Sequence, residues 1–212
     1  MSDGTRTPSM LRFATDPPTL VSLAGLAAAL AGIYFAIAGV LAAAMIGLVW
    51  AIAFDWYDGR VARAMKNRTA EQGQVGAQVD SLIDVISFGV LPALVLLSAG
   101  EFQLAFLPGA FVILAAAVVR LAYFNVFGLA EADTYRGLAL DNNAIVLVAL
   151  VALSPLMAPQ TFAIVLYVAL MGLVALNVST LKTPKFGGGW YYAIGAYAVV
   201  MTGVLGWQLA AL

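Results

Sequence analysis

Four aspartates stand at helical spacing beside the polar segment 58–76 of this chain. Asp55 and Asp58 close one long apolar stretch, and Asp80 and Asp84 open the next. A charged side chain at membrane depth costs about 2.5–3.5 kcal/mol, so carboxylates in such positions are rare and usually functional. We therefore expect a compensating partner, and a divalent metal ion together with a phosphate-bearing ligand suits this need.

The spacing of the aspartates predicts that they lie on the facing sides of two helices. At 100° per residue, one face of the first helix carries Asp55, Asp58, Gly59 and Ala62, with Arg63 at its edge. The matching face of the next helix carries Gly76, Asp80, Asp84 and Ser87. Two antiparallel helices joined by a short loop bring the faces together, and the four carboxylates then repel one another unless cations lie between them.

Oxygen-only ligation of this kind favours Mg²⁺ or Mn²⁺, which commonly bind through carboxylates and substrate phosphates. Gly59 and Gly76 leave room for a bulky ligand, and Arg63 offers a bidentate fork for a phosphate. The alternative is that the acids only pair with basic residues in a solvated loop. For Glu71 and Lys66 we adopt that interpretation, but the four aspartates in helical register favour a metal site.

The composition indicates a membrane protein without histidine or cysteine chemistry. Hydrophobic residues make up 63% of the 212 residues and charged residues 10%, and the mean hydropathy is +0.98. A soluble domain has about 25% charged residues. The absence of cysteine and histidine excludes disulfides, thiolate nucleophiles, Ser-His catalysis and HExxH metal sites.

The apolar stretches predict an all-α polytopic bundle with six to seven transmembrane helices. They run at about 18–38, 40–57, 77–98, 103–127, 143–157, 160–178 and 189–211. Most are long enough to cross a hydrocarbon core of about 30 Å, whereas 143–157 is short. Residues 18–212 form one membrane domain, and 1–17 form a cytoplasmic segment in which Met10, Leu11 and Phe13 suggest a short interfacial helix. This segment lacks the order of a cleaved signal peptide.

The distribution of basic residues predicts the orientation. With the N-terminus inside, the inward segments are 1–17, 58–76, 128–142 and 179–188, and they hold every lysine and arginine except Arg120, which lies in a helix leading to one of them. By the positive-inside rule we expect a multi-pass protein of the inner (cytoplasmic) membrane whose acidic site faces the cytoplasm. An odd number of crossings then places the C-terminus outside.

The aspartate pattern resembles the signature of the CDP-alcohol phosphotransferase family, D-x2-D-G-x2-A-R-x8-G-x3-D-x3-D. All fixed residues of the signature are present, but twelve residues instead of eight separate Arg63 from Gly76. Loops tolerate such insertions. The resemblance implies metal-dependent transfer of a phosphatidyl group from CDP-diacylglycerol, or a related CDP-lipid, to a small polar alcohol, with release of CMP. It also implies a homodimer.

The resemblance assigns roles to the residues that match the signature. Two metal ions, Mg²⁺ or Mn²⁺, would be held by Asp55, Asp58, Asp80 and Asp84. Asp84 would also act as the general base on the acceptor hydroxyl. The CDP-donor would be bound by Asp58, Gly59, Ala62, Arg63 and Gly76, with Gly59 and Ala62 against the cytidine and Arg63 on the diphosphate.

Flanking residues are similar to the bacterial and archaeal phosphatidylserine synthase branch of this family, which favours serine as the acceptor. The similar segments are Asp80–Pro92, Arg120–Asn125 and Asn177–Ser179 followed by Pro184, Lys185 and Phe186. Two departures border the expected acceptor loop. Tyr123 replaces the usual arginine, and Gly137-Leu-Ala-Leu-Asp141-Asn-Asn143 replaces the usual G-L-P-x-P-A.

The candidate acceptor-binding residues are Ser87, Arg120, Asn125, Arg136 and Lys185. Three of them have a structural alternative: Ser87 can bond its own helix carbonyl, Arg120 can snorkel or form an ion pair, and Lys185 can lie among lipid headgroups. We expect the aromatic residues Trp190, Tyr191, Tyr192 and Trp207 to form interfacial belts.

The alternatives to this function are the same chemistry with another acceptor, a divalent-cation transporter and a purely structural membrane protein. The same chemistry with inositol phosphate or glycerol phosphate as acceptor remains open. A divalent-cation transporter would need sites near the midplane, whereas these acids cluster at one membrane face. A purely structural membrane protein does not need four aspartates in helical register. We expect membrane lipids, and no nucleic acid, as further partners.

Overall fold

The computed structural model describes residues 9–128, 134–184 and 187–211. Nearly all of the regular structure in these residues is helical. The helices are α1 (Met10–Ala14), α2 (Pro17–Ile37), α3 (Leu41–Ala64), α4 (Ala70–Asp84), η1 (Val85–Val90), α5 (Leu91–Ala99), η2 (Leu104–Phe106), α6 (Leu107–Phe127), α7 (Leu140–Ala152), η3 (Ser154–Leu156), α8 (Pro159–Asn177) and α9 (Trp190–Ala210). Two short strands, β1 (Thr134–Arg136) and β2 (Lys182–Pro184), complete the described elements.

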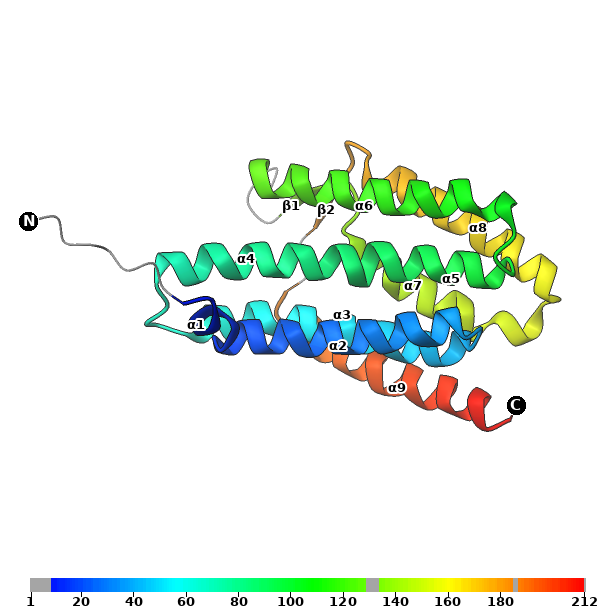
Figure 1. Ribbon diagram of the computed structural model, residues 1–212, viewed down its shortest axis with the longest axis horizontal. Helices are drawn as coiled ribbons and strands as arrows, with labels where there is room; N and C mark the ends of the chain where they lie inside the picture. The colour runs from blue at the N-terminus through cyan, green and yellow to red at the C-terminus, as the bar shows by residue number, and fades with distance from the viewer. Residues whose placement is uncertain (1–8, 129–133, 185–186, 212) are drawn as a thin grey trace, which may run out of the picture.

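The prediction of an all-α, multi-pass membrane protein is confirmed. Six helical stretches among the described residues are long and apolar enough to cross a membrane: α2, α3, the continuous run Ala70–Ala99, the run Leu104–Phe127, α8 and α9. The helices lie side by side along the long axis of the molecule (Figure 1). α1 lies near one end of that axis and the C-terminal end of α9 at the other.

The fifth predicted span, 143–157, corresponds to a shorter helix than the other spans. α7 has 13 residues, which is about 20 Å at 1.5 Å per residue and less than a hydrocarbon core. It begins at Leu140, before the apolar stretch, and ends at Ala152 because Pro155 follows in a tight 3₁₀ turn. The predicted first helix of the aspartate pair also extends beyond its apolar stretch, to Ala64.

Local sequence accounts for where the helices begin and turn. Proline occupies the first turn of α2, α6 and α8, where its missing N–H has no intrahelical acceptor. α4 starts with a capping box, in which Thr69 Oγ1 accepts from the Gln72 N–H and the Gln72 side chain accepts from the Thr69 N–H. Gly39 and Gly128 follow α2 and α6 with positive φ angles of 78° and 65°.

α2 and α3 cross at small residues. A Cβ atom on Gly47 of α3 would lie 2.6 Å from the Ala28 carbonyl oxygen and 2.7 Å from the Gly32 backbone of α2. Such contacts between small residues are how helices approach closely in lipid. The close crossing of α2 and α3 brings Ser22 of α2 next to the polar end of α3.

The strands β1 and β2 tie two connections together beside the bundle. They pair antiparallel, with Tyr135 opposite Thr183. Thr183 Oγ1 donates to the Gly137 carbonyl (2.7 Å), and the Gly137 N–H donates to the Leu181 carbonyl (2.7 Å). The loop before α7 is thereby held against the loop after α8.

Candidate active site

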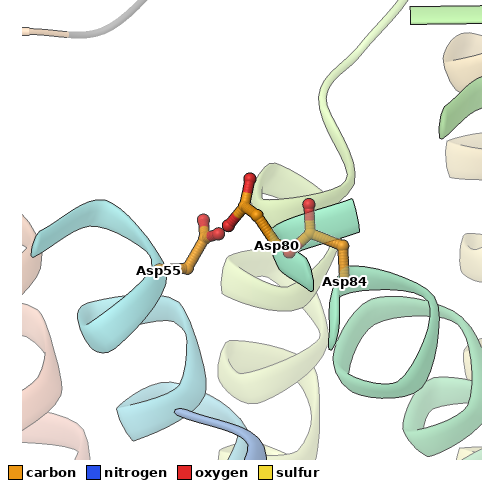
Figure 2. A group of neighbouring side chains, drawn as sticks. All are labelled: Asp55, Asp80 and Asp84. Carbon is orange, nitrogen blue, oxygen red and sulfur yellow. The ribbon is translucent and has the colours of Figure 1, made fainter. Parts of the chain in front are cut away.

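Three of the predicted metal ligands converge on one point. Asp55 of α3 and Asp80 and Asp84 of α4 each contribute a carboxylate oxygen, and these oxygens all lie within 4.8 Å of one another. Figure 2 shows the three carboxyl groups turned toward the same space from the two helices. Three anions this close need a cation between them, and their hard oxygen donors fit Mg²⁺ or Mn²⁺.

Asp58, the fourth predicted ligand, is fixed by a hydrogen bond from a third helix, α2. It lies outside this group of three, although it lines the same cavity. Its carboxylate accepts a hydrogen bond from Ser22 Oγ of α2, whose oxygen also lies 3.1 Å from the Pro18 carbonyl. Sequence reasoning missed Ser22, because a single serine in an apolar helix carries no signal of its own.

A turn of π-helix, η1, follows Asp84 directly. Such turns are frequent at functional sites, since they shift the register of the side chains that follow. Ser87 lies in this turn with 1% of its surface exposed, and its Oγ has no hydrogen-bond partner among the described residues. The alternative that Ser87 bonds its own helix carbonyl is therefore wrong. Its hydroxyl lines a small cavity together with Asp55 and Asp84.

The carboxylates open into a cavity of about 310 Å³ between α3, α4, α6, α7 and the β1–β2 segment. Its charged lining residues are Asp55, Asp58, Arg63, Asp80, Asp84, Arg120 and Asp141. A ligand that reaches the carboxylates through this cavity meets both anionic and cationic side chains.

A second cavity of about 160 Å³ adjoins the first and shares Asp58, Gly59 and Asp80 with it. Ala62 and Gly76, which the signature assigns to the donor, line this second cavity. A Cβ on Gly76 would collide with the Arg68 guanidinium, which pairs with Asp16 at 2.9 Å. The Arg68 guanidinium therefore occupies the space that a side chain at position 76 would fill.

Comparison with known proteins decides the family. The family model described as CDP-alcohol phosphatidyltransferase matches residues 16–175, a span that contains the aspartate signature and both cavities' acidic residues. The chain belongs to the CDP-alcohol phosphatidyltransferase family.

Curated members of this family are similar to the chain over part of their length. The archaetidylserine synthase of Methanothermobacter thermautotrophicus is 39% identical over 111 residues, which is 51% of this chain and 46% of that protein. The CDP-diacylglycerol–serine O-phosphatidyltransferase of Methanocaldococcus jannaschii is 35% identical over 136 residues, 64% of this chain and 60% of the relative. The enzyme of the same name from Mycobacterium tuberculosis is 40% identical over 79 residues, 37% and 26% of the two chains. Each alignment thus spans less than two thirds of the relative.

Arg63 lines the main cavity beside Gly59, which also lines the second cavity, and it contacts an aromatic residue of α9. A Cβ on Gly59 would lie 3.2 Å from Arg63 Nη1, and Arg63 Nη2 donates to the Tyr191 hydroxyl at 2.6 Å. Tyr191 lines the main cavity, so its assignment to an interfacial belt is wrong. α9 packs against α3 and places it there.

Arg120 of α6 lines the main cavity. Its Nε is buried and has no hydrogen-bond partner in the described part of the chain. The guanidinium is near enough to attract Asp84 and Asp141 electrostatically. An unpaired buried cation beside a cavity is a ready contact for an anionic group of a ligand.

Three of the predicted acceptor residues lie elsewhere or outside the described residues. Asn125 is exposed and accepts a hydrogen bond from Ser81 (3.0 Å). Arg136 is exposed and donates to the Tyr123 hydroxyl (3.2 Å), so it stands beside the tyrosine that replaces the usual arginine. Neither lines the main cavity. Lys185 lies outside the described residues.

The structure adds residues that the sequence did not single out. Trp56, Tyr135 and Asp141 line the main cavity, and Trp56 Nε1 donates to Asp141 Oδ2 at 2.8 Å. The signal for Asp141 was its position in a segment that departs from the family pattern, but only packing shows that it faces the aspartates. Burial, reinforced by Asp141, raises the pKa of the Tyr135 phenol, so its hydroxyl is protonated at neutral pH and can donate.

Proposed function

We propose that this protein transfers a phosphatidyl group from CDP-diacylglycerol, or a related CDP-lipid, to a small polar alcohol, and that serine is the favoured acceptor. The observation that carries the proposal is the meeting of Asp55, Asp80 and Asp84 at a cavity between α3 and α4 in a chain of this family. Serine is favoured because similar proteins are named serine transferases.

The aspartates would hold two divalent ions. The three clustered carboxylates, with Asp58 beside them, supply only hard oxygen donors, which suits Mg²⁺ or Mn²⁺. When bound, such ions neutralise the charge that develops on transferring and leaving phosphate oxygens.

The second cavity would take the nucleotide end of the donor. Gly59, Ala62 and Gly76 have no bulky side chains of their own, and the guanidiniums of Arg63 and Arg68 lie over the two glycines, where they would contact the nucleotide. Arg63, which lines the main cavity beside Gly59, would hold the diphosphate with its planar guanidinium. Asp58 lies on both cavities and would contact the donor as well as a metal ion.

The acceptor hydroxyl would approach through the main cavity. Its oxygen forms a bond to the phosphorus that carries the diacylglycerol, and the bond from that phosphorus to the CMP oxygen breaks. Asp84 takes the hydroxyl proton, and CMP leaves with the bridging oxygen. Ser87 and Arg120, which lie beneath and opposite Asp84, would position the acceptor.

The site would face the cytoplasm from the inner membrane. The polar ends of α3 and α4 carry the basic residues 60–68, which the positive-inside rule assigns to the cytoplasmic side. Family resemblance further suggests a homodimer and contact with membrane lipids.

An acceptor panel tests the proposed function. Purified protein is incubated with CDP-diacylglycerol, Mg²⁺ or Mn²⁺, and radiolabelled serine, inositol phosphate or glycerol phosphate. Labelled lipid with serine, in equal amount to the CMP released, supports the proposal. Label from another acceptor alone reassigns the acceptor, and absence of CMP release with every acceptor and either metal refutes the transferase function.

A further inference from the structure

Asp141 adds a fifth carboxylate to the main cavity, and it is not part of the aspartate signature. It stands in the first turn of α7, in the segment that departs from the family pattern. Its Oδ2 accepts the Trp56 Nε1–H at 2.8 Å, and its Oδ1 accepts the Asn142 N–H at 3.0 Å. These two contacts fix the orientation of the carboxylate, and no ion pair within the described residues neutralises its negative charge.

Aromatic side chains line the same cavity as this carboxylate. Trp56 packs edge-on against Tyr191 (centroids 5.9 Å apart), and Tyr135 packs against Phe124 (5.5 Å). All four rings line the cavity. A carboxylate beside aromatic faces attracts organic cations through both its charge and the ring quadrupoles.

A cationic side chain lies across the cavity from this group. Arg120 attracts Asp141 electrostatically, yet no ion pair joins the two within the described residues. Its buried Nε also has no hydrogen-bond partner there. In the described part of the chain, the cavity therefore presents an anion and a cation that form no ion pair, both near Asp84. This arrangement complements a small molecule that carries both charges.

We propose that Asp141, with Trp56 and Tyr135 beside it, binds the ammonium group of an amino-alcohol acceptor, while Arg120 binds the acceptor's carboxylate. The inference rests on the proposed function and deepens it, since it makes a hydroxy amino acid the preferred acceptor. Five carboxylates and two guanidiniums line the cavity, so Asp141 repels anionic acceptors such as inositol phosphate and glycerol phosphate.

The competing explanation is that Asp141 only stabilises the start of α7. An acidic residue in the first turn interacts favourably with the helix dipole, and the Trp56 contact could be merely structural. Asp141→Asn removes the charge while the amide oxygen can still accept from Trp56, although the contact with the Asn142 N–H is lost. A purely structural role predicts equal losses with every acceptor, whereas ammonium binding predicts a loss only with acceptors that carry an amine. Glu71→Gln, in the exposed first turn of α4, is the matched control for losing one acidic charge.

The test compares L-serine with 3-hydroxypropanoate, which is serine without its amine, and with ethanolamine, which lacks the carboxylate. We expect the unmutated protein to prefer serine over 3-hydroxypropanoate. Asp141→Asn should lower kcat/KM for serine about 10- to 100-fold, chiefly through KM, because it removes one partner of a desolvated charge pair. The kcat/KM for 3-hydroxypropanoate should not fall, because this acceptor has no ammonium group and its carboxylate is no longer repelled by Asp141. The KM for CDP-diacylglycerol should not rise, and all values for Glu71→Gln should stay unchanged.

Arg120→Gln provides the reciprocal measurement, since it should impair serine and 3-hydroxypropanoate but leave ethanolamine unaffected. Equal losses with serine and 3-hydroxypropanoate in Asp141→Asn would overturn the ammonium assignment. If Asp141→Asn does not insert into the membrane, the acceptor preference of the unmutated protein tests the assignment instead. Equal use of serine and 3-hydroxypropanoate would then overturn it. Transfer to glycerol phosphate alone overturns the assignment and leaves the transferase chemistry standing, whereas no transfer to any acceptor overturns both.

Discussion

The four signature aspartates are not equivalent in the structure. Asp55, Asp80 and Asp84 meet at one point, whereas the carboxylate of Asp58 is fixed by the Ser22 hydroxyl from a third helix. Groups behind a metal ligand orient it and tune its basicity. The side chains of three helices, α2, α3 and α4, therefore determine the geometry of this site.

Removing one charge from the cluster tests the metal assignment. Asp80→Asn or Asp58→Asn should reduce turnover more than about 100-fold, since losing a ligand costs more than losing an outer-shell group. The protein should still insert and elute as the unmutated protein does in detergent. The measurement is CMP release, with Glu71→Gln as the control. Turnover at the unmutated rate in either variant would refute the metal assignment.

The Ser22 contact leads to a second prediction at this scale. Ser22→Ala removes the hydroxyl that orients Asp58, so the Mg²⁺ or Mn²⁺ concentration for half-maximal activity should rise about 10-fold or more. A metal titration of CMP release measures it. Ser9→Ala, an exposed serine before α1, should leave the titration unchanged. An identical titration for Ser22→Ala would show that the contact has no role in metal binding.

Among the helices, the crossing of α2 and α3 controls how closely Ser22 can approach Asp58. Gly47 has no space for even one methyl group, because the α2 backbone occupies it. Backbone atoms cannot move aside as a flexible side chain can, so a larger residue must push the two helices apart.

Gly47→Ala should therefore lower the free energy of unfolding by about 1–3 kcal/mol, as overpacked cores do. The thermal midpoint of the purified protein in detergent measures this loss. Gly172→Ala in α8 is the matched control, because nothing lies within 4 Å of its Cβ position and alanine favours helix. Its midpoint should be equal or higher. A Gly47→Ala midpoint no lower than that of the control would contradict the close crossing.

At the scale of the whole molecule, the charged site and the C-terminal end of α9 lie at different ends of the bundle. α9 ends at the far end of the long axis from α1 (Figure 1). The apolar length of α2, the run Ala70–Ala99 and α9 suits membrane crossing. With the basic segments inside, the Gln103 turn and the end of α9 belong outside.

The natural absence of cysteine makes this orientation directly measurable. Single cysteines at Lys66, Gln103 and Ala211 are treated in intact cells with a membrane-impermeant maleimide. Cysteines at Gln103 and Ala211 should label, whereas Lys66→Cys should label only after permeabilisation. Both Lys66 and Gln103 are exposed, so burial does not explain a difference. Labelling of Lys66→Cys in intact cells would reverse the orientation.

The helical class, most helix positions and the aspartate cluster were predictable from sequence because they depend on short-range properties. The length of an apolar stretch decides whether a helix can cross a membrane, and residues three or four positions apart lie on the same face of a helix. Asp55 and Asp80 belong to consecutive spans, so a single antiparallel turn suffices to bring them together. The bounds of the shortened α7 were less predictable. The helix begins at Leu140, before the apolar stretch, and ends at Ala152 because Pro155 follows.

Only the tertiary structure decided which distant residues complete the cavity. Tyr191 and Asp141 reach it because α9 and α7 pack against α3, and Tyr135 because β1 pairs with β2. Asn125 and Arg136 point elsewhere although their sequence neighbours suggested the acceptor site. The physical reason is the separation in sequence between the residues that interact. Hydrophobic length and helical periodicity act within one segment, whereas a cavity wall depends on how segments far apart in the chain pack together, which no local pattern encodes.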